Sequence, residues 1–162
     1  MAGADVTANS ARAFALTFPF GRPSGKGCGF DAAYVWNYGG KMELVRHFRD
    51  AAVELDPNAA RMDEGVRFPL CRPEALMEVF ASGGLPGAEV TPIDVATPFA
   101  GFEDCWQPFL GGQRPAPACA MSLGEAARAR LRDRMRERMP VQADGSISLT
   151  APAWVIRATC AK

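Results

Sequence analysis

The chain has 162 residues, with 18 basic and 18 acidic side chains, so its formal net charge is zero. A neutral balance gives no long-range attraction to nucleic acid or to an anionic membrane, and we expect neither as a partner. Hydrophobic residues make up 48% of the chain and charged residues 22%, which is ordinary for one globular domain, and no run of eighteen apolar residues predicts a membrane span.

The cysteines and the single histidine limit the redox and metal chemistry that the sequence can support. The five cysteines are Cys28, Cys71, Cys105, Cys119 and Cys160. Their spacing is wide and irregular, no CxxC pair occurs, and His47 is the only histidine, so we expect neither a zinc site nor a disulfide framework. Met1–Ser10 lacks the basic start and apolar core of a secretory signal. These features favour a reducing, cytoplasmic location.

The first thirty residues contain one predicted strand and one glycine cluster. Ala13–Phe18 alternates apolar and other residues, which is typical of a strand. Gly25–Gly29 spells GxGxG, but a cofactor-binding glycine loop follows a strand directly and opens a helix. Here Arg22-Pro23-Ser24 precedes the glycines and a strand is expected after them, so the pattern disfavours a nucleotide site.

The stretch Asp31–Met42 organises the rest of the chain. Ala32–Trp36 is an uninterrupted run of small, apolar and aromatic residues, which predicts a strand buried on both faces of a parallel sheet. Gly39-Gly40 then releases the backbone before a helical pattern begins. Ligands of open α/β sheets bind beyond the carboxyl ends of strands. The first candidates for a binding site are Trp36, Asn37 and Tyr38. The alternative is that the two aromatic residues belong only to the core.

Glu43–Leu55 is predicted to be an amphipathic helix that Asp56-Pro57 ends. Its apolar face comprises Leu44, Phe48, Ala51, Ala52 and Leu55. The charged side chains, Arg46 and Arg49 among them, are expected mostly outside that face. His47 borders the apolar stripe near the predicted loop, where both a structural and a functional role remain open.

A second helix and a strand are predicted after the connector Phe68–Cys71. Pro73 suits the first position of a helix whose inner stripe is Leu76, Val79 and Phe80, and Gly83-Gly84 ends it. Glu89–Val95 follows as a strand. Because Pro92 inside it has no N–H to donate, we expect this strand at an edge of the sheet.

Gly101–Leu110 is predicted to be a short aromatic helix that contains Phe102, Trp106 and Phe109, with Pro108 limiting its length. Gly111–Pro117 is expected to be a flexible loop. An aromatic element between a strand and such a loop suits a lid over a pocket. A small satellite core is the equally favoured alternative.

Ser122–Glu125 has the pattern of a capping box and predicts a helix that runs to about Met139. Its apolar stripe is Leu123, Ala127, Leu131, Met135 and Met139. Six arginines surround that stripe, but Asp133 and Glu137 interrupt their charge, so a solvated face is favoured over an RNA-binding one. A turn at Asp144-Gly145 precedes two β-rich runs, Ser146–Thr150 and Ala153–Cys160.

The order of these elements and the wording of several stretches resemble a known family. From Ala32 to Cys160 the chain looks like the C-terminal half of class I S-adenosylmethionine-dependent methyltransferases, of the small-molecule type found in quinone biosynthesis. Val35–Gly40 resembles the fifth strand and its loop. Phe68–Pro73 resembles the lead into the helix before the sixth strand, and Trp106–Gly112 resembles the lid element.

The resemblance implies an α/β fold with part of a Rossmann-like sheet and flanking helices. Ala153–Cys160, as the seventh strand, is expected to run antiparallel in the middle, between Ala32–Trp36 and Glu89–Val95. Residues 31–162 are then the methyltransferase-like half, and residues 1–30 a non-matching segment that adds at most one strand. The first four strands and the acidic glycine-rich loop of that family have no counterpart in residues 1–30. We therefore expect a truncated or mis-started methyltransferase that binds S-adenosylmethionine weakly or not at all by itself.

The function that the resemblance implies is methyl transfer from S-adenosylmethionine to a small-molecule acceptor, with this chain as the substrate-side wall and lid. The expected substrate-binding residues are Trp36, Asn37, Tyr38, His47, Arg72, Trp106 and Phe109. No catalytic base is assigned. The alternative function is a non-catalytic remnant or interaction module. Without a fourth strand, Ala32–Trp36 would expose an edge, which we expect either Ala13–Phe18 to cover or self-association to bury.

Overall fold

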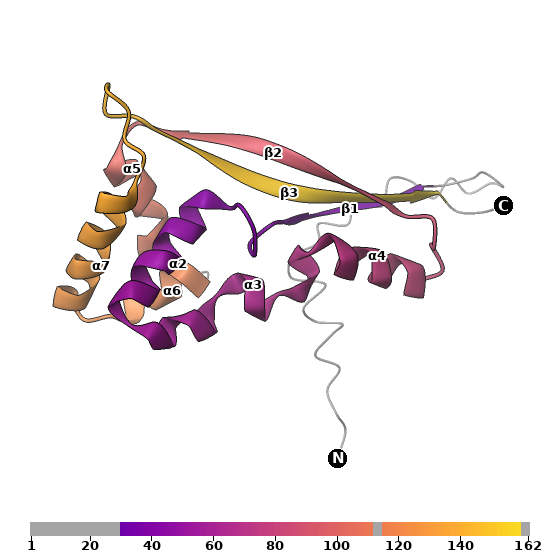
Figure 1. Cartoon of the computed structure of the whole chain (residues 1–162), viewed down its shortest axis with the longest axis horizontal. Coiled ribbons are helices and arrows are strands. Elements are labelled where there is room, and N and C mark those ends of the chain that lie inside the picture. Colours follow the sequence, from indigo (N-terminus) through magenta and orange to yellow (C-terminus); the bar gives the residue numbers. More distant parts are fainter. Residues whose placement is uncertain (1–29, 112–114, 160–162) are drawn as a thin grey trace, which may run out of the picture. The chain divides into compact units, whose positions relative to one another are not determined.

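The computed structural model of the protein describes residues 30–111 and 115–159 and has an α/β fold (Figure 1). The chain forms two compact units. In the described residues, unit 1 comprises 30–37, 68–94 and 152–159, and unit 2 comprises 38–67, 95–111 and 115–151. The predicted strand Ala13–Phe18, the glycines Gly25–Gly29 and the predicted cover of the sheet edge lie outside the described residues.

The sheet has three strands in the order β1-β3-β2, which confirms the predicted order. The strands are β1 (Phe30–Trp36), β2 (Glu89–Phe99) and β3 (Ile147–Thr159). β1 runs antiparallel to β3, with Ala33 opposite Ile156. β2 lies at an edge, as Pro92 predicted, and it continues past Val95 to Phe99.

Pro152 explains where the ladder between β1 and β3 ends. β3 is one continuous strand through Pro152, so the prediction of two separate runs was wrong. The carbonyl of Pro152 accepts a hydrogen bond from the amide of Asn37 at 2.9 Å. Because Pro152 has no N–H to donate to Asn37, the pairing of the two strands stops there. β1 therefore ends at Trp36, the residue before Asn37.

β1 is less buried than its composition predicted. Val35 is buried, whereas Ala32, Ala33, Tyr34 and Trp36 are only half-buried. Its hydrogen-bonded neighbour among the described strands is antiparallel. The prediction of a strand buried on both faces of a parallel sheet was therefore wrong, because small residues give an apolar run without filling two core faces.

Unit 1 has its core between the sheet and helix α4 (Pro73–Ser82), which follows the short helix η2 (Pro69–Cys71). Val35, Ile156 and Leu76 form the buried centre. The predicted start at Pro73 and end at Gly83 are confirmed. The predicted inner stripe is only partly right, because Val79 is exposed.

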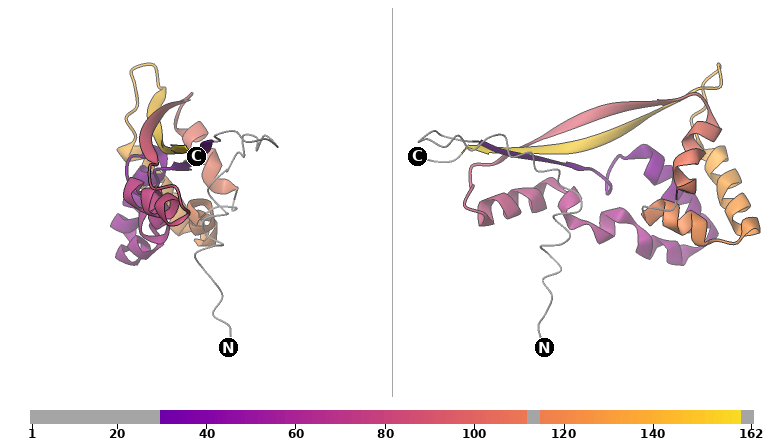
Figure 2. Two further views of the ribbon diagram at one scale, coloured as in Figure 1. Left: turned by 90° about the vertical axis from the view of Figure 1, so that its right-hand side faces the viewer. Right: turned by 180° about the vertical axis from the view of Figure 1, so that it is seen from behind.

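Unit 2 is mainly helical. Its helices are α2 (Glu43–Leu55), η1 (Pro57–Met62), α3 (Glu64–Arg67), α5 (Phe102–Trp106), η3 (Gln107–Leu110), α6 (Pro115–Ser122) and α7 (Glu125–Arg138). Helices α2, α6 and α7 pack against one another (Figure 2). In their core the ring of Phe48 stacks on Phe109 with the centroids 4.4 Å apart. The predicted helix Glu43–Leu55 is confirmed, although Leu55 itself is exposed.

The chain before α7 differs from its prediction. Ser122 is the last residue of α6, and its Oγ donates a hydrogen bond to the carbonyl of Cys119 at 2.8 Å. Helix α7 begins at Glu125, and Gly124 occupies its cap, so the predicted capping box was wrong. The predicted loop Gly111–Pro117 was also wrong at its end, because Pro115 opens α6. Prolines in a first helical turn forfeit no hydrogen bond.

The described part of the chain contains neither a candidate metal site nor a candidate membrane span. The residues described contain no group of His, Cys, Asp and Glu side chains that would hold a metal ion. No described helix is both long enough and apolar enough to cross a membrane. Cys105 and Cys119 are free thiols. Burial, and then the charge of Asp104, raises the pKa of the Cys105 thiol to about 11.

Candidate functional site

The predicted site residues fall into both units. In unit 1, Trp36 is half-buried at the end of β1 and lies edge-on to Tyr34, with the ring centroids 6.2 Å apart. Asn37 follows directly and donates its amide to Pro152. Arg72 is exposed and precedes α4, with no capping hydrogen bond from its side chain.

The other four predicted site residues belong to unit 2. Tyr38 is buried at the start of the turn after β1. Trp106 and Phe109 are buried in the core of unit 2, with ring centroids 5.7 Å apart. That burial favours a core role for the aromatic element over a lid, although the core is the main one of unit 2 and not a small satellite. His47 is half-buried on α2, where burial, and then the charge of Arg138, lowers its pKa below the ordinary value.

The glycine loop after β1 packs against its own chain. Gly65 donates its amide to Asp63 Oδ1 at 2.7 Å, and a Cβ atom on Gly65 would lie 2.5 Å from the Cα of Gly39. Glycine is therefore needed here for the close approach of two backbones. Because Gly65 fills the space beside Gly39, these residues do not fit a glycine-rich cradle for S-adenosylmethionine.

A buried ion pair connects α2 to α3 in unit 2. Arg49 is 1% exposed and Glu64 is 3% exposed. Arg49 donates from Nε at 2.8 Å and from Nη2 at 2.7 Å to the two carboxylate oxygens of Glu64. The prediction that placed Arg49 outside the buried face was wrong, because its partner comes from another element and makes burial of the guanidinium tolerable.

A second pair extends this network. Arg46, one turn before Arg49, donates to Asp63 Oδ2 at 2.5 Å. Partial burial by itself would raise the pKa of the Asp63 carboxyl, but the hydrogen bond and the charge of Arg46 outweigh it and lower that pKa. The sequence signal for this network was the adjacent acidic residues Asp63 and Glu64 together with two arginines three positions apart in the predicted helix, Arg46 and Arg49.

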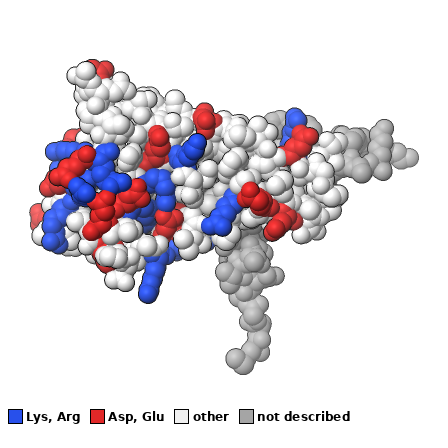
Figure 3. Space-filling view, viewed as in Figure 1, with Lys and Arg blue, Asp and Glu red and all other residues white. Residues whose placement is uncertain are grey.

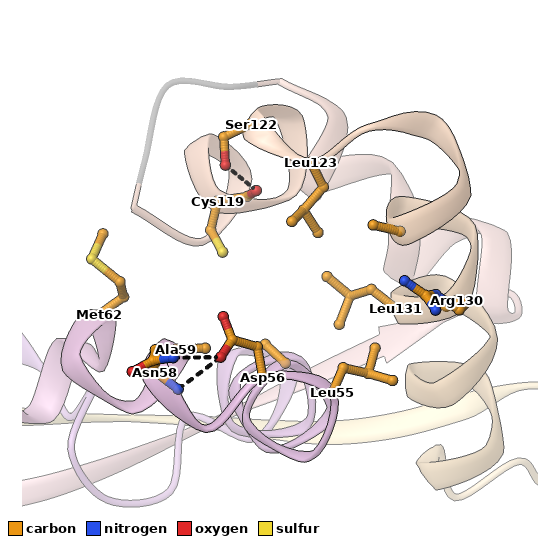
Figure 4. A pocket seen from close by; sticks show the side chains of 12 residues that line it. Leu55, Asp56, Asn58, Ala59, Met62, Cys119, Ser122, Leu123, Arg130 and Leu131 are labelled. Atoms are coloured by element: carbon orange, nitrogen blue, oxygen red, sulfur yellow. Dashed lines mark hydrogen bonds between the residues drawn. The ribbon is translucent and has the colours of Figure 1, made fainter.

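Unit 2 also contains a pocket with a volume of about 390 Å³, shown in Figure 4. Most of its wall is apolar, and its larger apolar side chains are Leu55, Met62, Leu123 and Leu131. The thiol of Cys119 on α6 points into this space. The pocket therefore combines a hydrophobic wall with few polar groups, as small-molecule sites do.

Asp56 places a carboxylate in the pocket. Its Oδ1 accepts hydrogen bonds from the amide of Asn58 at 2.9 Å and from Asn58 Nδ2 at 3.0 Å, which caps η1. The other carboxylate oxygen points into the pocket and has no hydrogen-bond donor among the described residues (Figure 4). The sequence marked Asp56 only as the end of a helix, although Asp-Pro-Asn is a cap signal.

The arginines of α7 are mostly paired with acids of unit 2. Arg132 and Arg136 both donate to Glu103 Oε1, and the guanidinium of Arg136 lies 4.6 Å from the centre of the Phe102 ring. Arg134 and Arg138 both bind Glu54. Figure 3 shows basic and acidic side chains interleaved over this part of the surface. The predicted solvated face is thus a network of ion pairs.

Comparison with known proteins gives no relative from which a function could be transferred. No family model matches the chain, and no curated protein matches it. A functional assignment therefore depends on the order of the strands, on the residues at their ends, and on the pocket and ion pairs of unit 2.

Proposed function

We propose that the chain is the C-terminal, substrate-side part of a class I S-adenosylmethionine-dependent methyltransferase that acts on a small molecule. The observation that supports this is the strand order β1-β3-β2, with β3 antiparallel to β1. The resemblance implied this order and direction for the fifth, seventh and sixth strands. Helix α4, which precedes the edge strand β2, also has the expected place and start.

In this proposal the chain binds and orients the methyl acceptor. S-adenosylmethionine, when bound, supplies the methyl group. Transfer requires the acceptor atom to be held in line in a site from which water is excluded. Trp36 is the last residue of β1, and Asn37 and Tyr38 follow it, at the end of the strand where ligands of such sheets bind. Arg72 is the proposed polar contact from unit 1. His47, Trp106 and Phe109 belong to unit 2, the two aromatic residues to its core, and their roles are proposed from the resemblance alone.

A non-catalytic interaction module is the second candidate function. The observation that favours it is that the first four strands and the acidic glycine-rich loop, which hold the cofactor in that family, have no counterpart in residues 1–30. A module of this kind would retain the sheet and the helices and would bind neither the cofactor nor a methyl acceptor.

A comparison of methyl transfer by two proteins distinguishes the methyltransferase from the interaction module. One protein is the 162-residue chain, and the other is the same chain extended by the coding sequence upstream of Met1. Each is incubated with isotopically labelled S-adenosylmethionine and a short-chain hydroquinone, and the hydroquinone is analysed by mass spectrometry. We expect label in the hydroquinone only with the extended protein. Absence of transfer by both proteins would favour the interaction module.

The acceptor residues are tested in the extended protein by Arg72→Gln. Arg72 is exposed, so the variant is expected to fold and to raise the KM for the acceptor. Arg61→Gln, which removes an exposed arginine that is not among the proposed contacts, is the matched control and should leave the KM unchanged. Equal effects of the two substitutions would remove Arg72 from the proposed site.

A further inference from the structure

We propose that the pocket of unit 2 binds a small molecule that has an apolar body and a hydrogen-bond-donating group, either a hydroxyl or an ammonium. The pocket is lined by η1 and α2 on one side and by α6 and α7 on the other (Figure 4). Its residues are separate from those proposed to bind the methyl acceptor, so the inference does not rest on the proposed function. A volume of about 390 Å³ lies within the range of small-molecule sites, roughly 300–1,000 Å³.

The apolar surface of the pocket fits an apolar ligand body. Leu131 is buried at the back of the pocket. Leu55 is 47% exposed and Met62 is 41% exposed, so two large apolar side chains of the wall remain in contact with water. A bound molecule would remove part of that surface from water, which is the principal source of affinity in sites of this type.

The polar atoms on the side of Asp56 favour a donor on the ligand, whereas Arg130, the one cation among the described lining residues, is exposed and lies on α7, on the opposite wall (Figure 4). The carboxylate of Asp56 is an acceptor, and one of its oxygens is open to the pocket. The hydroxyl of Ser122 already donates to the carbonyl of Cys119, so its oxygen has only acceptor capacity left. The Cys119 thiol is a weak donor and a weak acceptor. A ligand that offers only acceptors, or a negative charge, would therefore leave Asp56 unpaired or repelled.

The Asp56 carboxylate is held in place before any ligand binds. Two hydrogen bonds from Asn58 fix its Oδ1 at the start of η1. The far end of η1 leads into Asp63 and Glu64, which the network with Arg46 and Arg49 ties to α2. Because both ends of η1 are fixed, the Asp56 carboxylate loses little conformational freedom when a ligand binds, which favours affinity.

Arg49 is a buried cation close to Cys119, although it does not itself line the pocket. Its Nη1 has no hydrogen-bond partner among the described residues, although the side chain is almost fully buried. Burial by itself would lower the pKa of Arg49, but Glu64, and after it Cys119, which lines the pocket, outweigh burial and raise that pKa. Cys119 is therefore a suitable reporter, since a ligand in the pocket would cover its thiol.

Four probes of similar size test the proposal on the full chain. Benzyl alcohol and benzylamine carry a donor, benzyl methyl ether carries none, and benzoate carries a negative charge. Affinity is measured by ligand-detected NMR, and occupation of the pocket by the rate at which N-ethylmaleimide alkylates Cys119, followed by peptide mass spectrometry. We expect both donors to bind about tenfold more tightly than the ether and benzoate, and to slow alkylation of Cys119.

The four probes also distinguish the two donor sources and can overturn the proposal. Tighter binding of benzylamine than of benzyl alcohol would assign a cationic ligand, and the reverse order would assign a neutral alcohol or phenol. Equal affinity for the ether and the donors would overturn the proposal. So would binding that leaves the alkylation rate of Cys119 unchanged.

Two pairs of variants locate the binding. Asp56→Asn keeps an oxygen that caps η1 and should remove the preference for donors, whereas Asp144→Asn, in an exposed turn of the same kind, should not. Ala127→Phe should fill the pocket and abolish probe binding, whereas Ala126→Phe, exposed and outside the pocket, should leave it intact. Unchanged probe binding in both Asp56→Asn and Ala127→Phe would contradict the proposal.

Discussion

Arg49 on α2 and Glu64 on α3 form a buried, two-point ion pair, with donor–acceptor distances of 2.8 and 2.7 Å. The pair joins two helices of unit 2 that are separated along the chain by η1. Because η1 carries Asp56 at its cap and Met62 at its end, the same pair stabilises one wall of the pocket.

Glu64→Ala tests this pair. The substitution leaves the Arg49 guanidinium buried without a counter-charge, and we expect a loss of about 3–5 kcal/mol in the free energy of unfolding. The measurement is urea denaturation. Glu103→Ala, which removes an exposed partner of Arg132 and Arg136, is the control and should cost far less. Equal losses in the two variants would show that burial of the Arg49 pair has no energetic consequence.

Gly65→Ala tests the close contact with Gly39. The added methyl group would lie 2.5 Å from the Cα of Gly39, so the two backbones must separate. We expect a destabilisation of about 1–3 kcal/mol, measured as a lower Tm. Gly87→Ala is the control, because nothing lies within 4 Å of its added Cβ. A Tm that is unchanged in Gly65→Ala would contradict the close contact between the two backbones.

His47 gives the fold a dependence on pH. Burial and Arg138 lower its pKa in the folded state from the ordinary 6.5, so the unfolded chain binds this proton first as the pH falls. The stabilisation is therefore complete above pH 6.5 and is lost as the pH falls from 6.5 through the folded-state pKa. We expect the Tm to decrease over this window and the decrease to be smaller in His47→Gln. An identical decrease in both proteins would assign it to other groups.

Trp106→Ala separates the two interpretations of the aromatic element. Trp106 is buried and contacts Phe109, so we expect the variant to lose about 3–5 kcal/mol of stability. Denaturation of the chain measures this loss. Retained stability, with reduced turnover in the extended protein, would instead support the lid interpretation.

The parts of the fold that depend on local patterns were predictable. Helix α2 begins at Glu43 and ends at Leu55 as predicted, because an apolar stripe and Asp56-Pro57 specify both its face and its end. Pro92 marked β2 as an edge strand, because a proline without an N–H is excluded from a central ladder position whose donor is needed.

The parts that depend on distant partners were not predictable. Ser122 has the sequence of a cap, but Pro115 had already started α6, so Ser122 closes that helix instead. Burial of Arg49 requires Glu64. The carboxylate oxygen of Asp56 that accepts no hydrogen bond from the described residues faces a pocket only because α6 places Cys119 on the opposite side. Each is a tertiary contact between residues whose local patterns are compatible with exposure.

The most direct test of the proposed function is a calorimetric titration of S-adenosylmethionine. It is carried out with the 162-residue chain and with the chain extended upstream of Met1. We expect a micromolar dissociation constant, about −8 kcal/mol, for the extended protein and no measurable binding to the shorter one. Micromolar binding by the shorter chain would contradict the conclusion that its glycine loop does not fit the cofactor. Absence of binding by both proteins would contradict the assignment as part of a methyltransferase.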